Sequence, residues 1–116
     1  MRDLILHNPR CSKSRETLKL LQDRGVDLEV VEYLKQPLSK KELTELCALL
    51  GLKPLQIVRT KEALFGELGL SADSGYSDAQ WIDVLASHPK LMERPIVVYR
   101  GKAAVGRPPE NVLTLL

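Results

Sequence analysis

The sequence predicts a single α/β domain, spanning residues 1–116, with a mixed four-stranded sheet flanked by helices. Three observations predict this fold class. Short apolar runs indicate buried strands, amphipathic runs with capping signals indicate helices between them, and 116 residues suit one compact domain. The order of these segments also predicts a helical insert, at about 52–90, before the third strand.

The first segments form a strand–helix–strand unit. The apolar run 4–6 predicts a buried strand, and Leu18 and Leu21 then mark one face of a helix. Gly25 follows the helical residues, and glycine is common directly after a helix end, so Gly25 marks the end of this helix. The run 28–33 predicts a second strand. A strand–helix–strand unit implies a parallel strand pair with a right-handed crossover.

The middle of the chain carries helix signals only. Ser39 is followed three residues later by Glu42, which forms a capping box and predicts a helix up to Leu50. Pro54 is placed to open a short helix, and a second capping box begins at Ser77. The glycines between them predict short helical pieces and loops.

The last third predicts a hairpin and a short helix. The run 96–99 is the strongest strand signal in the chain, and Arg100-Gly101 suits a two-residue turn into 102–105. Val112 lies on the apolar side of a short terminal helix. A parallel pair extended by this hairpin gives the arrangement of a thioredoxin-like fold.

Composition excludes several classes of protein. The net charge of +2 is too small to indicate nucleic-acid binding, and no apolar run is long enough to span a membrane. Two cysteines do not make a disulfide scaffold, and two histidines with them do not form a metal site at these spacings. We therefore expect a cytoplasmic protein that binds no metal, nucleic acid or membrane. We also expect a monomer, although composition does not determine the oligomeric state.

Cys11 is the candidate reactive residue. It lies between the first predicted strand and a helix that starts near Lys13, so the thiol faces free backbone N–H groups and the positive end of the helix dipole. Arg10, Lys13 and Arg15 add positive charge. These features favour the thiolate, the nucleophilic form. Cys47, by contrast, lies on the apolar face of a predicted helix and is expected to fill the core.

Three neighbours are expected to support the thiolate. His7 can add positive charge or donate a hydrogen bond to sulfur, and Ser14 can direct its hydroxyl at the sulfur from the first helical turn. Arg15 can orient the loop, or it can pair with Glu16 or Asp23.

Four motifs of this chain resemble motifs of the ArsC family of glutaredoxin-dependent arsenate reductases. The chain is similar to a short branch of that family. In chain order the motifs are His7-Asn8-Pro9-x-Cys11-x-x-Ser14-Arg15, Arg59-Thr60-Lys61-Glu62, His88-Pro89 with Arg94-Pro95-Ile96-Val97-Val98, and Gly106-Arg107-Pro108. They occur in the order of the family and cover nearly the whole chain.

The resemblance implies a thioredoxin-like fold with a helical insert and a cis peptide bond before Pro95. It implies that Cys11 is the nucleophile and that Arg59, Arg94 and Arg107 hold an oxyanion. The implied reaction is reduction of arsenate to arsenite. Glutathione is the co-substrate, glutaredoxin resolves the mixed disulfide, and no cofactor is bound.

Two alternatives remain open. A glutaredoxin-like thiol oxidoreductase would act on glutathione mixed disulfides instead of arsenate. An Spx-like regulatory binding protein would share the fold and contact RNA polymerase. By resemblance, such regulators carry a Cys-x-x-Cys motif that acts as a redox switch. This chain has Ser14 where the second cysteine of that motif would stand, which disfavours an internal disulfide with Cys11.

Overall fold

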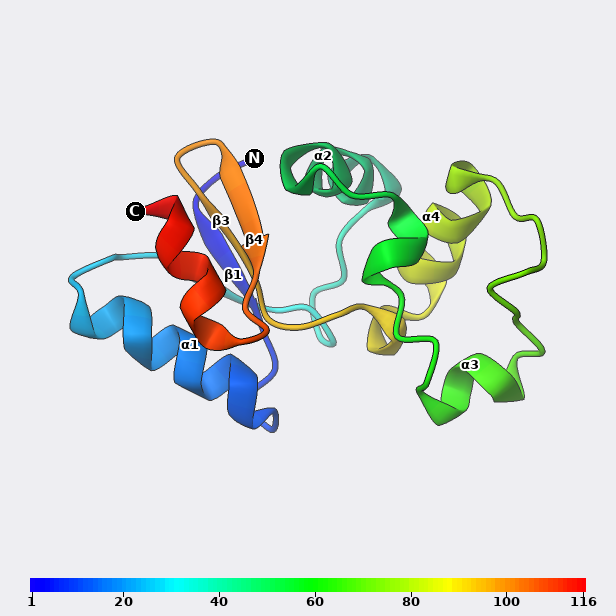
Figure 1. Cartoon of the computed structure of the whole chain (residues 1–116), viewed down its shortest axis with the longest axis horizontal. Helices are drawn as coiled ribbons and strands as arrows, with labels where there is room; N and C mark the ends of the chain where they lie inside the picture. Colours follow the sequence, from blue (N-terminus) through cyan, green and yellow to red (C-terminus); the bar gives the residue numbers. More distant parts are fainter. The chain divides into compact units, whose positions relative to one another are not determined.

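The computed structural model describes all 116 residues and divides into two compact units (Figure 1). The first unit comprises residues 1–37 and 94–116, and the second comprises 38–93. The second unit is longer than the helical insert expected at about 52–90. It also contains α2 (Lys40–Leu50), because α2 packs against α4 (Asp78–Ser87).

The first unit is built on a mixed four-stranded sheet, as predicted. Its strands are β1 (Leu4–His7), β2 (Glu29–Glu32), β3 (Ile96–Tyr99) and β4 (Lys102–Val105), in the spatial order β2-β1-β3-β4. β1 pairs parallel with β2 and antiparallel with β3, which forms a hairpin with β4. The parallel pair and the hairpin both confirm the sequence prediction, and together they form the thioredoxin-like sheet.

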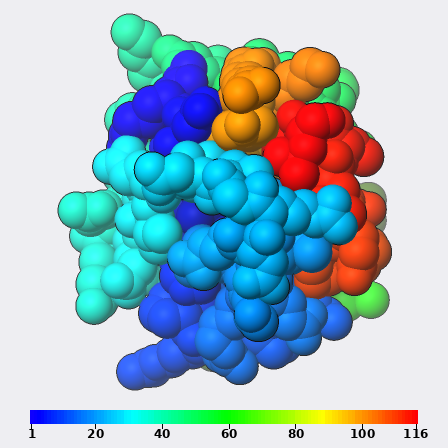
Figure 2. All heavy atoms as spheres, turned by 90° about the vertical axis from the view of Figure 1, so that its left-hand side faces the viewer, coloured from blue at the N-terminus to red at the C-terminus, as the bar shows by residue number.

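Helices cover one face of this sheet. α1 (Ser12–Asp23) and the 3-10 helix η3 (Pro109–Leu115) lie side by side, as Figures 1 and 2 both show. Their apolar side chains join those of the two central strands in one buried cluster, which comprises Ile5, Leu21, Val97, Val112 and Leu115. The terminal helix predicted around Val112 is therefore present, in 3-10 form. This layer holds α1 against the sheet.

Local signals account for the turns and helix ends of the first unit. Arg100 and Gly101 both have positive φ angles, of 50° and 76°, which suits a two-residue turn between antiparallel strands. Gly25 has a φ of 72° directly after the end of α1.

The second unit is helical. Besides α2 and α4 it contains η1 (Pro54–Ile57), α3 (Ala63–Glu67) and η2 (Pro89–Leu91). Both predicted capping boxes, at Ser39 and Ser77, are formed with reciprocal hydrogen bonds. The Phe65 ring stacks on Trp81 with centroids 6.1 Å apart, which anchors α3 to α4. None of the helices in the chain combines the length and hydrophobicity needed to cross a bilayer.

Candidate active site around Cys11

Cys11 occupies the N-cap position of α1, directly after the loop that leaves β1. Its backbone is extended (φ −94°, ψ 122°), its N–H donates to Asn8 O at 3.0 Å, and its carbonyl accepts from Arg15 N at 3.0 Å. The side chain makes no capping hydrogen bond and is 9% exposed. The sulfur is therefore held at the start of the helix, where the first backbone N–H groups have no partner within the helix.

The thiol of Cys11 has a lowered pKa. Burial raises the pKa, but four groups together outweigh burial. They are the backbone N–H of Ser14, the guanidinium of Arg94, the backbone N–H of Lys13 and the guanidinium of Arg107. Each of them stabilises a negative charge on sulfur. The thiolate, which is the attacking form, is therefore more populated at neutral pH than in a free cysteine.

Arg94 and Arg107 bring two guanidinium groups to the thiol. Arg107 Nη2 lies 3.6 Å from Cys11 Sγ, and Arg107 Nε donates to Arg94 O at 2.8 Å. Arg94 Nε is buried and has no hydrogen-bond partner. A buried cationic N–H without an acceptor is unusual, and an anion bound next to the Arg94 guanidinium would supply one. The peptide bonds before Pro95 and Pro108 are both cis.

Gly106 sets how closely this arginine segment approaches α1. A Cβ added at Gly106 would lie 2.7 Å from Thr17 Oγ1 and 2.8 Å from Pro95 Cγ. Gly106 N also donates to Pro95 O at 2.9 Å. The sequence did not predict this role of Gly106 or the contact with Thr17. The available signal was the glycine placed directly before Arg107.

His7 and Ser14 support the loop, but not in the way expected. Ser14 Oγ lies 2.6 Å from His7 Nδ1 and accepts from Asn8 N–H at 3.0 Å, and Ser14 is fully buried. The hydroxyl is therefore engaged away from the sulfur, and Ser14 acts on Cys11 through its backbone N–H instead. The expectation that the Ser14 hydroxyl is directed at the sulfur is corrected accordingly.

Of the two roles considered for His7, the environment of the ring disfavours a positive charge. Burial lowers the pKa of its imidazole, Glu32 opposes the shift, and Arg15 adds to it. The lowered pKa favours the neutral form of the ring. Its contact with Ser14 connects the end of β1 to the first turn of α1.

Arg15 orients the loop, which was one of the two roles considered for it. Arg15 Nη1 donates to Pro9 O at 2.9 Å. The alternative partners are engaged by lysines, since Lys13 pairs with Glu16 and Lys19 pairs with Asp23.

Arg59 is a residue of the second unit and has an environment of its own. Arg59 Nη2 pairs with Glu62 Oε2 at 3.0 Å, and Arg59 Nη1 donates to Lys90 O at 3.3 Å. The structure thus brings Cys11, Arg94 and Arg107 together in the first unit and gives Arg59 a separate set of contacts.

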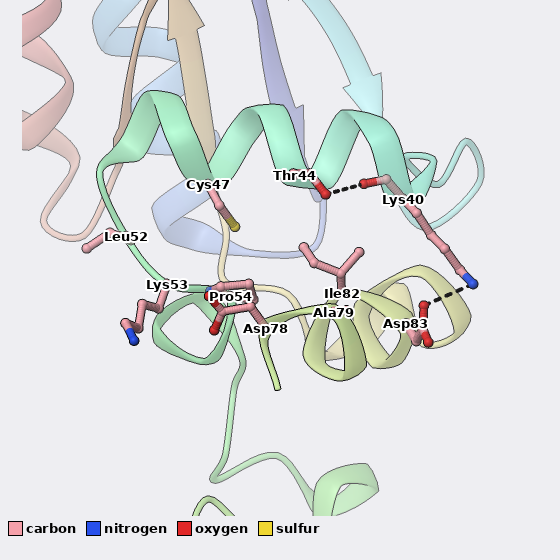
Figure 3. Close-up of a pocket in the computed structure, with 10 residues that line it drawn as sticks. All are labelled: Lys40, Thr44, Cys47, Leu52, Lys53, Pro54, Asp78, Ala79, Ile82 and Asp83. Carbon is pink, nitrogen blue, oxygen red and sulfur yellow. Dashed lines mark hydrogen bonds and ion pairs between the residues drawn. The ribbon is translucent and has the colours of Figure 1, made fainter. Parts of the chain in front are cut away.

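The second cysteine lines a pocket of about 480 Å³ between α2, η1 and α4. Figure 3 shows the Cys47 side chain directed from α2 into this pocket, with the Lys40–Asp83 ion pair (2.9 Å) at one end. Burial raises the pKa of the Cys47 thiol, and the carboxylate of Asp78 raises it further. Cys47 is buried, as predicted, and its raised pKa disfavours the thiolate, which is the nucleophilic form.

Comparison with known proteins places these features in a family. The ArsC family model matches residues 6–115. An Escherichia coli K12 relative, the uncharacterized protein YfgD, is 52% identical and covers 97% of this chain and 94% of its own length. A Neisseria meningitidis serogroup B protein named arsenate reductase is 49% identical, covering 97% and 96%.

Solved structures agree with the sequence matches. A Vibrio cholerae structure described as an arsenate reductase superposes with a TM-score of 0.93 at 50% identity, covering all of this chain and 98% of its own. A Yersinia pestis structure described as a putative arsenate reductase gives 0.91 at 50% identity, covering 97% and 98%. With a family model that spans nearly its whole length and relatives at about half identity, the chain belongs to the ArsC family.

Proposed function

We propose that this protein reduces arsenate to arsenite at Cys11, with glutathione and glutaredoxin as the reductants. The observation that carries the proposal is the contact of Arg107 Nη2 with Cys11 Sγ at 3.6 Å. The Arg94 guanidinium also stabilises the thiolate, and its buried Nε has no hydrogen-bond partner. Guanidinium groups bind the oxygens of tetrahedral oxyanions through paired N–H donors. The relatives named arsenate reductase support the same substrate.

The first step joins sulfur to arsenic. Cys11–SH and H₂AsO₄⁻ give Cys11–S–AsO₃H⁻ and water, so an S–As bond forms, an As–O bond breaks, and arsenic remains in the +5 state. Arg94 and Arg107 reduce the repulsion between thiolate and oxyanion, and the start of α1 adds backbone N–H groups. We propose that Arg59 is the third arginine that holds the oxyanion.

The second step transfers the electrons. Glutathione attacks the adduct and gives the Cys11–glutathione disulfide and H₂AsO₃⁻, so arsenic gains two electrons and the two sulfurs lose them. Glutaredoxin then takes the glutathione moiety onto its own cysteine and restores the Cys11 thiol. An external resolving thiol is consistent with Ser14 three residues after Cys11 and with the raised pKa of Cys47.

A coupled assay tests the proposal. NADPH oxidation is followed with the purified protein, glutathione, glutaredoxin and glutathione reductase, with and without arsenate. We expect an arsenate-dependent rate that Cys11→Ser abolishes. We also expect Arg94→Ala to lower the rate by about 100-fold, the typical loss for one donor to a developing oxyanion.

Arg24→Ala is the matched control for Arg94→Ala, because Arg24 is an exposed arginine of the same unit whose side chain makes no hydrogen bond or ion pair. It should leave the rate unchanged. A folded protein without any arsenate-dependent rate would refute arsenate as substrate.

The same assay separates the two alternatives. Arsenate-independent reduction of a glutathione mixed disulfide would favour the glutaredoxin-like activity. Inactivity toward both substrates would favour a regulatory binding protein.

A further inference from the structure

The backbone around Arg59 is fixed by pairing with a segment more than 30 residues later in the chain. Arg59 N donates to Leu91 O at 2.7 Å, and Glu93 N donates to Ile57 O at 2.8 Å. Val58 and Met92 form an antiparallel bridge between these two bonds. The side chain of Arg59 therefore starts from a rigid position.

The spacing of Arg59 and Glu62 places their side chains together. Glu62 N donates to Arg59 O at 3.1 Å, so the four residues form a turn, and Glu62 is then the N-cap of α3. Phe65 N donates to Glu62 O at 3.0 Å, and the Phe65 side chain is buried. Glu62 is thus held by the packing of α3 as well as by the turn.

The Glu62 carboxylate lies between two cations. One oxygen pairs with Arg59 Nη2 at 3.0 Å, and the other lies 3.4 Å from Lys90 Nζ. The Arg59 and Glu62 side chains are only 22% and 16% exposed, whereas Lys90 is 61% exposed. The Arg59–Glu62 pair is therefore less screened by water than an ordinary surface ion pair.

The pair orients the guanidinium without saturating it. Arg59 donates one N–H to Glu62 and one to Lys90 O, and a guanidinium carries five N–H donors. Three donors remain for a ligand. A planar group held at two points has a defined orientation, which is what recognition of a tetrahedral oxyanion by paired donors requires.

We infer that Glu62 is a positioning residue for oxyanion binding, and that it acts by orienting Arg59. This inference rests on the proposed function, because it takes Arg59 as one of the arginines that bind arsenate. Glu62 itself does not bind the oxyanion, since its own charge is negative. Its effect is on affinity, and the reactivity of Cys11 does not depend on it.

The experiment measures arsenate binding without turnover. The full-length Cys11→Ser protein is titrated with arsenate by isothermal titration calorimetry, and Glu62→Ala and Glu62→Gln are each added to it. We expect Glu62→Ala to weaken binding about tenfold, the low end of what loss of a hydrogen-bonded supporting partner costs at metal sites. We expect Glu62→Gln to weaken binding about threefold, because a neutral acceptor makes a weaker bond to guanidinium.

Glu67→Ala and Glu67→Gln are the matched controls, since Glu67 is an exposed glutamate of the same unit that makes no ion pair. They should bind arsenate like the parent. In a second measurement, Glu62→Ala with Cys11 intact should react with the neutral reagent iodoacetamide at the wild-type rate. A general structural defect would slow or accelerate this reaction.

The outcomes separate the two proposals. Unchanged affinity in the Glu62 variants, with the parent binding arsenate, would overturn the role of Glu62 alone. A changed iodoacetamide rate in Glu62→Ala would overturn it as well. If the Cys11→Ser parent does not bind arsenate, the proposed oxyanion site fails and this inference fails with it. If Glu62→Ala does not fold, the isosteric Glu62→Gln decides the question.

Discussion

Gly106→Ala tests whether close packing behind the arginine segment shapes the site. The added Cβ would lie 2.7 Å from Thr17 Oγ1, 2.8 Å from Pro95 Cγ and 3.2 Å from Thr17 Cγ2. Thr17 is fully buried, and its hydroxyl donates to Lys13 O at 2.8 Å, so it has little freedom to move. The strand end that carries Arg107 must therefore shift away from α1.

Two effects follow from this shift. Overpacking of a well-filled site costs about 1–3 kcal/mol, and we expect about 2 kcal/mol here. At this chain length that corresponds to a decrease in Tm of about 10 °C. Because Arg107 helps to lower the pKa of Cys11, its displacement should also raise that pKa and slow alkylation of the thiol at pH 7.

Thermal unfolding and iodoacetamide kinetics measure the two effects. Gly66→Ala is the matched control, because nothing lies within 4 Å of a Cβ at Gly66, a residue inside α3. Gly66→Ala should leave the Tm unchanged or raise it slightly. The substitution Thr17→Ala removes two of the three close contacts. In that background Gly106→Ala should lower the free energy of unfolding by at least about 1 kcal/mol less than it does in the wild-type protein. Equal costs in both backgrounds would refute the packing argument.

Two further predictions concern the loop that holds the thiol. The iodoacetamide rate of Cys11 should rise with pH to a plateau whose midpoint lies below the ordinary thiol pKa of about 8.5, and a midpoint at or above that value would contradict the assigned environment. Ser14→Ala leaves the buried His7 Nδ1 and Asn8 N–H without their partner, and it should lower the free energy of unfolding by about 1–3 kcal/mol in urea titrations. A loss below about 0.5 kcal/mol would indicate that water replaces the hydroxyl.

Local signals were sufficient to predict most of the fold. The two capping boxes, the positive-φ glycine after α1 and the Arg100-Gly101 turn depend on a few neighbouring residues, and the structure contains them all. The sheet followed from the apolar runs and the handedness of the crossover. The extent of the second unit could not be predicted in this way, because it depends on the packing of α2 against α4.

The details of the site depend on contacts between distant residues, and the sequence does not state them. The spacing of three residues correctly places Ser14 beside Cys11, but the hydroxyl turns toward His7 because that ring is buried at the end of β1. Glycine is required at position 106 because the side chain of Thr17 on α1, almost 90 positions earlier, leaves no room for a Cβ. Glu62 was quoted only as part of a motif, and its role depends on where its carboxylate pairs with Arg59, which the motif alone does not state.

The two cysteines provide a final test, because their pKa shifts have opposite signs. For Cys11 the folded pKa lies below the unfolded value. Between these two values the unfolded chain binds the extra proton, so the stability contributed by the Cys11 thiolate increases with pH. That contribution is complete above the unfolded pKa and is lost as the pH falls through the folded pKa.

For Cys47 the folded pKa lies above the unfolded value. The folded protein holds the proton after the unfolded chain has released it, so the contribution of Cys47 is complete below the unfolded pKa. It is lost as the pH rises from that value through the folded pKa.

Urea unfolding of wild type, Cys11→Ser and Cys47→Ala from pH 6 to pH 10 separates these contributions. The difference between wild type and Cys11→Ser should grow with pH up to about 8.5 and then level off, whereas the difference between wild type and Cys47→Ala should shrink above about 8.5. Parallel pH profiles for all three proteins would mean that neither thiol titrates differently in the folded protein. The argument that helix α1, Arg94 and Arg107 select Cys11 as the reactive thiol would then fail.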